Sequence, residues 1–443
     1  MSMQDDMING ILLVYHHRLM KNAPMIHEHV DAFLRDSRFR TWAINTEGGF
    51  PSGLRDLRFR IVLLHYSLFG YWPYLQLSNQ FLRYLAESKG SYKIAFFQDE
   101  YHFCQSRFDF INQCGIDCVY TLLEPEYFKE VYGKFTKAKS FIYTIPGYVS
   151  DQLLDKEKRF YKHDGERDID IGYRSRPVMY YMGKGAQEKT EIAHTFLERG
   201  RDLGLKLDIG TEENQRLYGD HWYKFLAECR AVLGVEAGVS IFDLQDKVRK
   251  DCERLLSENP GLSFEDVSSR ILEPWEGNIY YRTISTRHFE AAAFKVCQIL
   301  FEGKYSAIME PMVHYLPLRK DFSNLDEVIR LFRDRNVRQE LTENAYRDLI
   351  ASGKYSYKAF IDGFDHDLLA KGINPGIDET QAKRVTETLA RGRIQFYLRV
   401  FLKMMRYYPY PGKALITKPL KPLVVRYRRY RQNRLGGHLH ARR

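Results

Sequence analysis

Short apolar runs alternate with amphipathic stretches along the first 150 residues. The runs are short enough for buried strands, and the stretches between them repeat apolar positions at helical spacing. We expect strands at residues 11–15, 41–45, 61–64, 94–97, 118–122 and 141–145. We expect helices at residues 23–35, 75–87, 106–113 and 125–132. Buried strands that alternate with helices form parallel sheets covered on both faces, so residues 1–150 are predicted to form a Rossmann-like domain.

The same alternation restarts after a weakly patterned stretch at residues 145–167, which is predicted to be a linker. Strands are expected at residues 178–182, 205–209, 231–236 and 298–301. Helices are expected at residues 189–203, 218–229, 286–294, 324–335 and 337–351. A charged, mostly helical insertion interrupts this unit at about 244–276. The second predicted Rossmann-like domain therefore covers residues 151–365.

Residues 366–443 are predicted to form a third, helical and then basic, extension. Helices are expected at 381–391 and 394–405, and the proline-containing stretch 407–422 is expected to be extended. The Asp-His-Asp run at 365–367 follows no strand and is interpreted as surface.

The predicted fold class is α/β, with two Rossmann-like domains. Ligands of open parallel sheets bind at the carboxyl ends of the strands, so two such sheets face to face would share one cleft.

Charge is distributed unevenly along the chain. Residues 391–443 hold 15 Lys or Arg and no Asp or Glu, so the other 390 residues carry −5 of the total charge of +10. A basic tail on a mildly acidic body indicates a tether to anionic membrane lipids. Nucleic acid is a rival partner, because Arg interleaved with Tyr also suits base stacking, and a solvated end is the third alternative.

Other bulk features narrow the class of protein. No apolar run is long enough for a membrane span, and the acidic start lacks the order of a signal peptide, so a cytoplasmic location is expected. Six scattered cysteines favour buried thiols over a disulfide framework or a zinc site. No P-loop, GxGxxG run or nucleophile elbow occurs, which argues against kinases, dehydrogenases and esterases.

The strongest local signal is the stretch 284–303, ISTRHFEAAAFKVCQILFEG. Ser285 is a good N-cap, and the small residues that follow allow a helix to pack closely on a strand. A helix N-terminus at the end of a sheet suits a diphosphate, and Glu290 lies about one and a half turns further along. The alternative is an ordinary amphipathic helix with Glu290 in solvent.

This stretch resembles the donor-binding motif of GT-B glycosyltransferases of group 1, which are family 4-like. Further stretches resemble a bacterial subgroup encoded with surface-polysaccharide genes: QDEY at 98–101, DIGYRSR at 170–176, GVEAGVSIFD at 234–243 and HYLPLRKDFSNLDEV at 314–328. The resemblance implies that Glu290 binds the nucleotide ribose. The chain departs from the family pattern at Arg282, where an earlier Glu would touch the donor sugar, and at Phe294-Lys295, where a Gly is usual.

Cations cluster at predicted strand ends of the second unit. Fixed cations stabilise the charge of a leaving nucleoside diphosphate, and Arg adds bidentate geometry. The candidates are Arg174, Arg176, Lys184, Lys189 and Arg287, with surface charge as the alternative. The GT-B resemblance implies that such cations replace a bound metal, so no metal and no cofactor is expected.

Polar residues also follow the strand predicted at 231–236. Glu236 leaves a buried strand end and is placed to meet a ligand hydroxyl, and Ser240 lies close behind it. The alternative is a tight turn in which Ser240 caps a helix.

The first unit offers candidates for a catalytic base. An inverting transferase needs a group that takes a proton from the acceptor hydroxyl, and Asp, Glu or His can serve. Asp99 follows a predicted strand and is the first choice; His16 and His102 follow. For each His the alternative is a hydrogen-bonded turn residue.

The sequence therefore predicts a glycosyltransferase that moves a sugar from a UDP- or GDP-sugar to a glycan or lipid-linked acceptor in surface polysaccharide assembly. Nucleic acid is not expected as a partner. The protein is expected to lie peripherally on the inner face of the membrane. Two alternatives stay open: a nucleotide-sugar epimerase or hydrolase on the same fold, and a non-catalytic protein that binds anionic polymer or membrane.

Overall fold

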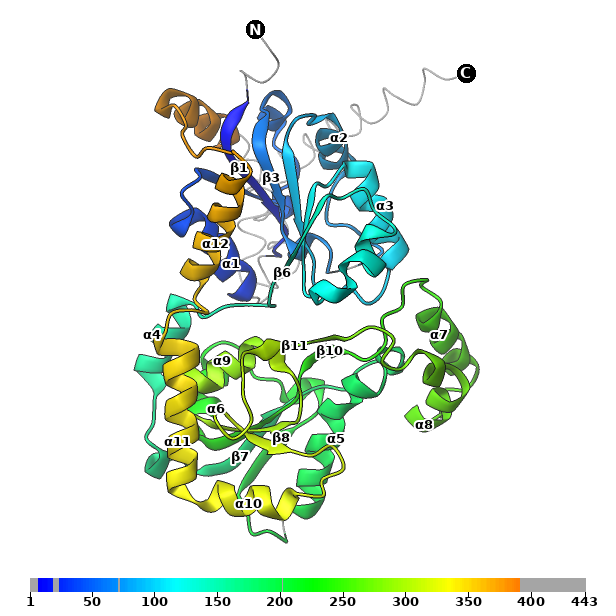
Figure 1. The fold of residues 1–443 in the computed structure, drawn as a ribbon, viewed down its shortest axis with the longest axis vertical. Helices are drawn as coiled ribbons and strands as arrows, with labels where there is room; N and C mark the ends of the chain where they lie inside the picture. The colour runs from blue at the N-terminus through cyan, green and yellow to red at the C-terminus, as the bar shows by residue number, and fades with distance from the viewer. Residues whose placement is uncertain (1–6, 19–23, 71, 201, 391–443) are drawn as a thin grey trace, which may run out of the picture.

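The computed structural model describes residues 7–18, 24–70, 72–200 and 202–390, and shows two lobes, one above the other (Figure 1). The first lobe is built on a six-stranded sheet in which each strand runs parallel to its neighbours, in the order β2-β1-β3-β4-β5-β6. Its strands are β1 (Ile8–Tyr15), β2 (Thr41–Asn45), β3 (Phe59–Leu64), β4 (Tyr92–Phe96), β5 (Cys118–Thr121) and β6 (Ser140–Tyr143).

Both faces of this sheet are covered by helices. Leu12 and Val14 of β1 point into the core that includes α2 (Asn79–Glu87) and α3 (Cys104–Cys114). Ile11 and Leu13, which alternate with them, point into the core beneath α1 (Pro24–Asp36). Alternate residues of a strand face opposite sides, so an unbroken apolar run such as ILLV is the pattern of a strand buried on both faces.

The second lobe is built on a five-stranded parallel sheet in the order β13-β12-β9-β7-β8. Its strands are β7 (Ile169–Arg174), β8 (Leu207–Gly210), β9 (Cys229–Gly234), β12 (Cys297–Phe301) and β13 (Leu316–Leu318). Its helices are α4 (Asp151–Phe160), α5 (Lys184–Arg199), α6 (Asp220–Glu228), α9 (Thr286–Ala293), α10 (Leu325–Arg333) and α11 (Arg335–Ala345). Two parallel α/β domains thus confirm the predicted fold class.

Two additions extend the second lobe. The short strands β10 (Ala237–Val239) and β11 (Tyr281–Thr283) pair antiparallel near the first lobe. Between them lies the expected insertion, with α7 (Val248–Glu258) and α8 (Phe264–Val267), at one side of the molecule in Figure 1. The insertion has a small core of its own, around Val248, Cys252, Val267 and Leu272.

The chain then returns to the first lobe. Helix α12 (Tyr357–Ala370) buries Tyr357, Ile361, Phe364 and Leu368 in the core beneath α1. The expected domain boundary at 365 therefore falls inside a helix that belongs to the first lobe. A helix at 379–390 follows, near the one expected at 381–391, and also packs on the first lobe.

Asp365 corrects the interpretation of the Asp-His-Asp run as surface. Its side chain is fully buried and accepts hydrogen bonds from the Ser37 hydroxyl and the backbone N–H of Arg38. The carboxylate therefore fastens α12 to the turn after α1.

Three local predictions were wrong. Residues 178–182 contain a 3-10 turn, η7 (Tyr180–Met182), and the first strand of the second lobe is β7 instead. The predicted linker contains α4, whose N-cap Ser150 accepts from the backbone N–H of Leu153. The helix expected at 125–132 is a 3-10 turn followed by a π-helical turn, η4 (Pro125–Tyr127) and η5 (Lys129–Gly133).

The remaining short helical turns connect the main elements. They are η1 (Thr46–Gly48), η2 (Ser52–Asp56), η3 (Tyr66–Leu68), η6 (Asp164–Glu166), η8 (Glu213–Gln215), η9 (Ser268–Leu272), η10 (Glu273–Trp275), η11 (Tyr305–Ala307) and η12 (Tyr346–Ala351). The features predicted at 394–405 and 407–422, and the basic tail, lie outside the described residues. Within the described ranges, no helix is both long and apolar enough to cross a membrane.

Candidate active site in the cleft between the domains

A cavity of about 530 Å³ lies between the two lobes. Asp99, which follows β4, lines it from the first lobe. Arg174 at the end of β7 and Gly234 at the end of β9 line it from the second lobe. The carboxyl ends of both sheets therefore meet at one cavity, which is where parallel α/β sheets bind their ligands. Its volume is in the range of cavities that hold small molecules.

The cavity brings together half of the predicted site residues. Those that line it are Asp99, Arg174, Arg176, Lys189, Ser285 and Arg287. Those that are not among its lining residues are His16, His102, Lys184, Glu236, Ser240 and Glu290.

The cations in the cavity differ in how freely they can meet a ligand. Arg176 is exposed and forms no ion pair with the described residues, whereas Arg174 donates to the Asp208 carboxylate at 2.8 Å and stacks on Phe225 at 4.1 Å. Arg287 donates to the backbone carbonyl of Arg174 and lies over the Trp222 ring at 5.1 Å. Asp208 already balances Arg174, so Arg176, Arg287 and Lys189 supply the cationic character of the cavity.

The N-terminus of α9 opens directly onto the cavity. Ser285, Thr286, Arg287 and His288 all line it, and the helix dipole adds partial positive charge at this end. The first-turn N–H groups of a helix lack intrahelical partners, which makes this end a suitable anion site. This end of α9 is therefore suited to an anionic group.

His288 is a lining residue that sequence reasoning missed. Its Nδ1 accepts the backbone N–H of Ser285 at 3.0 Å, which places the ring proton on Nε2. Burial lowers the pKa of His288 to about 3, with further lowering by Arg287, so the ring is neutral. None of the residues that the structure describes forms a hydrogen bond with Nε2, and the atom lies beside Gly234. Its Nε2–H is therefore a hydrogen-bond donor of fixed orientation at the cavity wall.

Glu290 does not line the cavity itself but contacts a residue that does. Its carboxylate accepts the indole N–H of Trp222 at 2.8 Å, and Trp222 itself lines the cavity. Burial raises the pKa of Glu290, while the Trp222 hydrogen bond and Arg287 lower it. In this arrangement Glu290 orients Trp222, and a ligand hydroxyl would have to reach the carboxylate beside the indole.

Asp99 has the setting of a reactive carboxylate. Its side chain is exposed within the cleft and makes no hydrogen bond with the part of the chain that the structure describes, and its backbone has φ 53°. Surrounding protein raises its pKa by desolvation, against the opposing effect of Lys189, Arg107 and Arg176. The pKa of Lys189 is lowered by burial and raised by Asp99, so the two groups interact across the cleft.

The two histidine candidates are placed less favourably. Burial lowers the pKa of His102 to about 4, and Arg107 and Arg249 lower it further, which makes its ring a weak base. The Nδ1 of His16 lies 2.8 Å from the Thr46 hydroxyl. Both have the hydrogen-bonded or packed setting of turn residues, which leaves Asp99 as the candidate base in the cavity.

The N-terminus of α5 is occupied by the protein itself. The hydroxyl of Ser240 accepts the N–H of Gly185 at 2.9 Å, and the Glu276 carboxylate accepts the N–H of Lys184 at 2.7 Å. Lys184 is exposed on the outside of this turn. Ser240 thus has the capping role that was its alternative interpretation, and this helix end offers a ligand fewer free N–H groups than α9 does.

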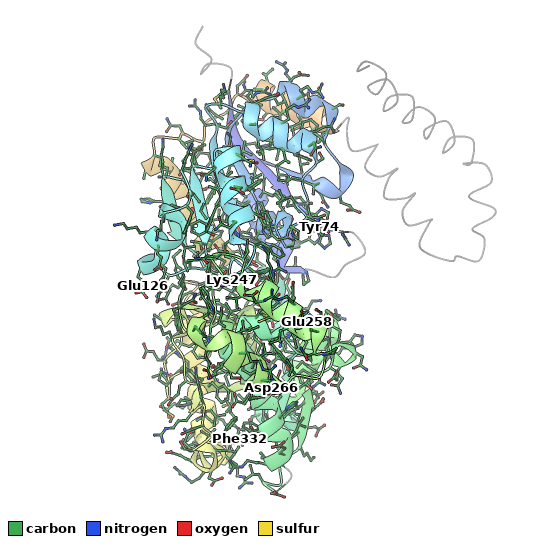
Figure 2. All side chains as sticks on the ribbon, turned by 90° about the vertical axis from the view of Figure 1, so that its right-hand side faces the viewer. Tyr74, Glu126, Lys247, Glu258, Asp266 and Phe332 are labelled. Atoms are coloured by element: carbon green, nitrogen blue, oxygen red, sulfur yellow. The ribbon has the colours of Figure 1, made fainter. Side chains whose placement is uncertain are left out.

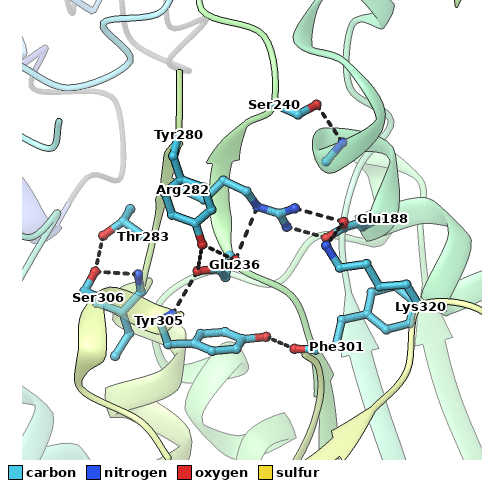
Figure 3. A network of polar contacts seen from close by, with 12 residues as sticks. Glu188, Glu236, Ser240, Tyr280, Arg282, Thr283, Phe301, Tyr305, Ser306 and Lys320 are labelled. Atoms are coloured by element: carbon cyan, nitrogen blue, oxygen red, sulfur yellow. Dashed lines mark hydrogen bonds and ion pairs between the residues drawn. The ribbon is translucent and has the colours of Figure 1, made fainter. Parts of the chain in front are cut away.

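Glu236 belongs to a buried polar network instead of the cavity wall (Figure 3). Its oxygens accept the Tyr280 hydroxyl at 2.9 Å and the backbone N–H of Tyr305 at 2.8 Å, and Arg282 lies 3.5 Å away. Arg282 also pairs with Glu188. With 3% of its surface exposed, Glu236 shapes the loop after β9, which brings Ala237 and Gly238 to the cavity.

Aromatic residues at the cavity were also missed. Tyr173, Tyr181 and Trp222 line it together with Met179 and Met182. Tyr181 and Met182 lie in η7, within the run VMYYM that was predicted to be a strand. The apolar pattern correctly indicated packing, but it did not distinguish a strand from a turn at the cleft.

No group of three or more His, Cys, Asp or Glu side chains that could hold a metal ion occurs within the described ranges. All six cysteines are buried and free.

The chain matches no family model and no curated protein. It is similar in fold to solved structures of glycosyltransferases. One is an alpha-glucosyltransferase in complex with UDP-glucose and DNA, with 11% identity, a TM-score of 0.49, and coverage of 81% of this chain and 99% of that one. Another is TarM, with 14% identity, a TM-score of 0.41 and coverage of 69% and 53%. A glycosyltransferase from Rickettsia africae has 10% identity, a TM-score of 0.44 and coverage of 83% and 98%. At such identities the likeness concerns the fold alone, and the fold assignment rests on the two sheets themselves.

Proposed function

We propose that this protein is a glycosyltransferase that uses a nucleotide-sugar donor. The observation that carries the proposal is the division of chemistry across the cavity. Arg176, Lys189, Arg287 and the N-terminus of α9 supply positive charge from the second lobe, and Asp99 supplies a carboxylate from the first. An anionic leaving group on one side and a base on the other are what group transfer to a hydroxyl requires.

The donor is proposed to lie against the second lobe. Its diphosphate would bind the first turn of α9, with Arg287 and Arg176 beside it and the Nε2–H of His288 donating to one oxygen. The ribose would lie near Trp222 and Glu290. A UDP- or GDP-sugar is the expected donor, and the cations take the role of a metal, so a metal-independent hexosyl transfer is proposed.

The acceptor is proposed to approach from the first lobe, beside Asp99. Asp99 would take the proton from the acceptor hydroxyl as that oxygen bonds to the anomeric carbon, while the bond to the diphosphate breaks. We propose a glycan or lipid-linked acceptor of surface polysaccharide assembly. Residues 391–443, with 15 basic residues, would hold the enzyme at the inner membrane face, and nucleic acid is not the proposed acceptor.

The first experiment is a binding screen of the full chain with UDP, GDP, CMP and their sugars, by calorimetry and thermal shift. Binding of a nucleotide that is weakened at least tenfold by Arg287→Ala, and left unchanged by Arg330→Ala on the exposed face of α10, is the expected result (roughly 1.4 kcal/mol per tenfold). Absence of binding to any nucleotide would refute the proposal.

Product analysis then separates the reactions. Sugar transfer that needs an added acceptor supports a transferase, whereas acceptor-independent release or inversion of the sugar would identify the hydrolase or epimerase alternative. The same assay after EDTA treatment tests metal independence. Liposome binding lost on removal of 391–443 supports the tether, and binding that survives would refute it.

A further inference from the structure

We propose that the second lobe clamps the loop that carries Asp99, and that Tyr281 is a positioning residue for that carboxylate. The clamped loop comprises residues 99–105. It follows β4 and includes the first two residues of α3. The inference rests on the proposed function, since it assigns Asp99 as the base. It adds that the orientation of the base is set from the opposite domain.

The first contact of the clamp is made by the buried carboxylate of Glu100, next to Asp99. One oxygen accepts the hydroxyls of Thr121 and Tyr132, and the other accepts the backbone N–H of Leu122 at 3.0 Å. These three donors come from the first lobe. The fourth comes from β11 of the second lobe, where the Tyr281 hydroxyl donates to the same carboxylate at 2.9 Å.

The Glu100 carboxylate therefore receives its hydrogen bonds from both lobes. It is fully buried, and a buried carboxylate is costly unless its oxygens are hydrogen-bonded. Burial and the neighbouring Glu100 raise the pKa of Tyr281 well above its usual value, so the phenol remains a donor. The backbone N–H of Glu100 also donates to the Tyr281 hydroxyl at 3.3 Å, which ties the main chain beside Asp99 to β11.

The second contact is a helix cap supplied from the other lobe. Phe103 stands at the N-cap position of α3 and has no side-chain oxygen to accept from the first turn. Asp246, in the insertion just before α7, accepts the backbone N–H of Cys104 at 2.9 Å and of Gln105 at 3.3 Å. Lys247, which follows Asp246, lies at the junction of the lobes in Figure 2.

A third contact continues the clamp along the backbone. The N–H of Asp243 donates to the carbonyl of Tyr101 at 2.8 Å, and the Gln105 amide donates to the carbonyl of Leu244 at 2.9 Å. The segment 243–246 and Tyr281 thus hold the clamped loop at both of its ends and in its middle.

The loop conformation itself needs such restraint. Asp99 and Phe103 both have φ 53°, in the left-handed region, which is especially unfavourable for a bulky residue such as Phe. Residues persist in this region only where their surroundings over-determine them. From the first lobe, the buried Arg107 donates to the backbone carbonyls of Glu100 at 2.6 Å and His102 at 3.1 Å. The contacts of Tyr281 and the segment 243–246 come from the second lobe, so docking of the lobes adds to the restraint that holds Asp99 in its orientation toward the cavity.

The clamp also joins the two sides of the active site. Tyr281 pairs with Val239 in the antiparallel strand pair β10–β11, and the neighbouring Gly238 lines the donor side of the cavity. The same strand pair therefore borders the donor and orients the base. A protein with its lobes apart would keep its donor residues but lose the geometry of Asp99.

The test uses Tyr281→Phe in the full chain, with Tyr305→Phe as the matched control. Tyr305 is equally buried and donates its hydroxyl to the backbone carbonyl of Phe301, but it does not touch the clamped loop. We expect Tyr281→Phe to lower kcat about 10- to 100-fold with an unchanged KM and Kd for the donor, and Tyr305→Phe to leave kcat unchanged. A Tyr281→Phe enzyme with the kcat of the control would overturn the proposal.

A second measurement reads the clamp without any activity. Amide hydrogen exchange of residues 98–105 is expected to be faster in Tyr281→Phe and in Asp246→Ala than in the wild type, and unchanged in Tyr305→Phe. Unchanged exchange in both clamp variants would refute the clamp. Failure of every nucleotide to bind the wild type would instead refute the proposed function, and the exchange result would still decide whether the second lobe holds the loop.

Discussion

Arg282 and Glu188 form a buried ion pair in which both terminal nitrogens of the guanidinium donate to the two carboxylate oxygens, one at 2.8 Å (Figure 3). Each side chain is about 8% exposed, and Lys320 lies 2.8 Å from the same carboxylate. Arg282 stands where the family pattern has an acid that touches the donor sugar. Its guanidinium instead pairs with Glu188 and Glu236, and Arg282 is not among the residues that line the cavity, so Arg282 is a structural cation.

Arg282→Met is accordingly expected to destabilise the protein by about 3–5 kcal/mol, because it leaves Glu188 and Glu236 buried with less compensation. Urea unfolding measures this loss. Nucleotide affinity of the folded protein is expected to remain that of the wild type, since Arg282 does not line the cavity. The pair replacement Arg282→Met with Glu188→Leu is the control, and it should recover part of the loss. A stable Arg282→Met protein with weakened donor binding would show that the residue acts on the ligand.

Asp99→Asn is expected to lower kcat about 10²- to 10⁴-fold, the usual contribution of a general base, without weakening nucleotide binding. Desolvation raises the pKa of Asp99 above its ordinary value of 3.8, and a base must be deprotonated to act. Activity should therefore be lost as pH falls through this raised pKa. The acidic limb of the kcat/KM profile of the wild type measures it.

Lys189→Met provides the electrostatic test of the same assignment. Lys189 lowers the pKa of Asp99, so its removal should move the acidic limb to higher pH. His102→Gln is the control and should leave the limb in place, because His102 does not line the cavity. A limb that responds to His102→Gln and not to Lys189→Met would assign the base to the histidine.

The sequence was most informative about the buried strands. The apolar runs ILLV and RIVLL are typical of strands buried on both faces of a parallel sheet. In the structure they form β1 and β3, which are paired neighbours in the first sheet. Strand β7 was missed because IDIGYR interleaves Asp170 and Gly172 with its apolar residues. The more apolar VMYYM was favoured, although those side chains pack against the insertion and the cleft. An apolar run reports burial, and it does not report the backbone conformation.

The site residues divide along the same physical line. Asp99 and Ser285 were found because each directly follows a strand or begins a helix, which is local information. The placement of Glu236 depends on Tyr280, Arg282 and Tyr305, which are more than 40 residues away in the sequence. His288 was missed because its role depends on a fixed tautomer and on the nearby Gly234, which lies at the end of β9 and is far away in the sequence. Such long-range contacts are set by the fold, and no characteristic residue spacing in the sequence indicates them.

Ser240 and Ser285 allow a comparison between a capping hydroxyl outside the cavity and an N-cap hydroxyl that lines it. Ser240→Ala removes an acceptor from the first turn of α5 and should cost about 1 kcal/mol of stability with no change in nucleotide affinity. Ser285 lines the cavity, so Ser285→Ala should weaken nucleotide binding, by about 1 kcal/mol for a lost hydrogen bond. Thermal unfolding measures the stability of the two variants, and calorimetry measures their nucleotide affinity. Each variant is the control for the other. A loss of affinity in Ser240→Ala would restore that residue to the donor site.

Glu28 is expected to make stability depend on pH. Burial raises its pKa from 4.5 to about 7; a hydrogen bond from Ser150 opposes this, and Glu290 and Asp31 add to it. The folded state therefore keeps a proton that the unfolded state has released above pH 4.5, so this group's contribution falls as pH rises from 4.5 to 7. Glu28→Gln should remove this dependence and be more stable than the wild type by roughly 1–3 kcal/mol at pH 8.

Urea unfolding at pH 5 and pH 8 measures the effect as a difference between variant and wild type. Glu126→Gln, at an exposed carboxyl labelled in Figure 2, is the matched control and should follow the wild type at both values. Because Glu290 of α9 is one of the groups that raise the pKa of Glu28 in α1, after burial as the main cause, Glu290→Gln should reduce the pH dependence without abolishing it. A Glu28→Gln protein whose stability falls between pH 5 and pH 8 as steeply as that of the wild type would mean that the Glu28 carboxyl is already ionised in the folded state.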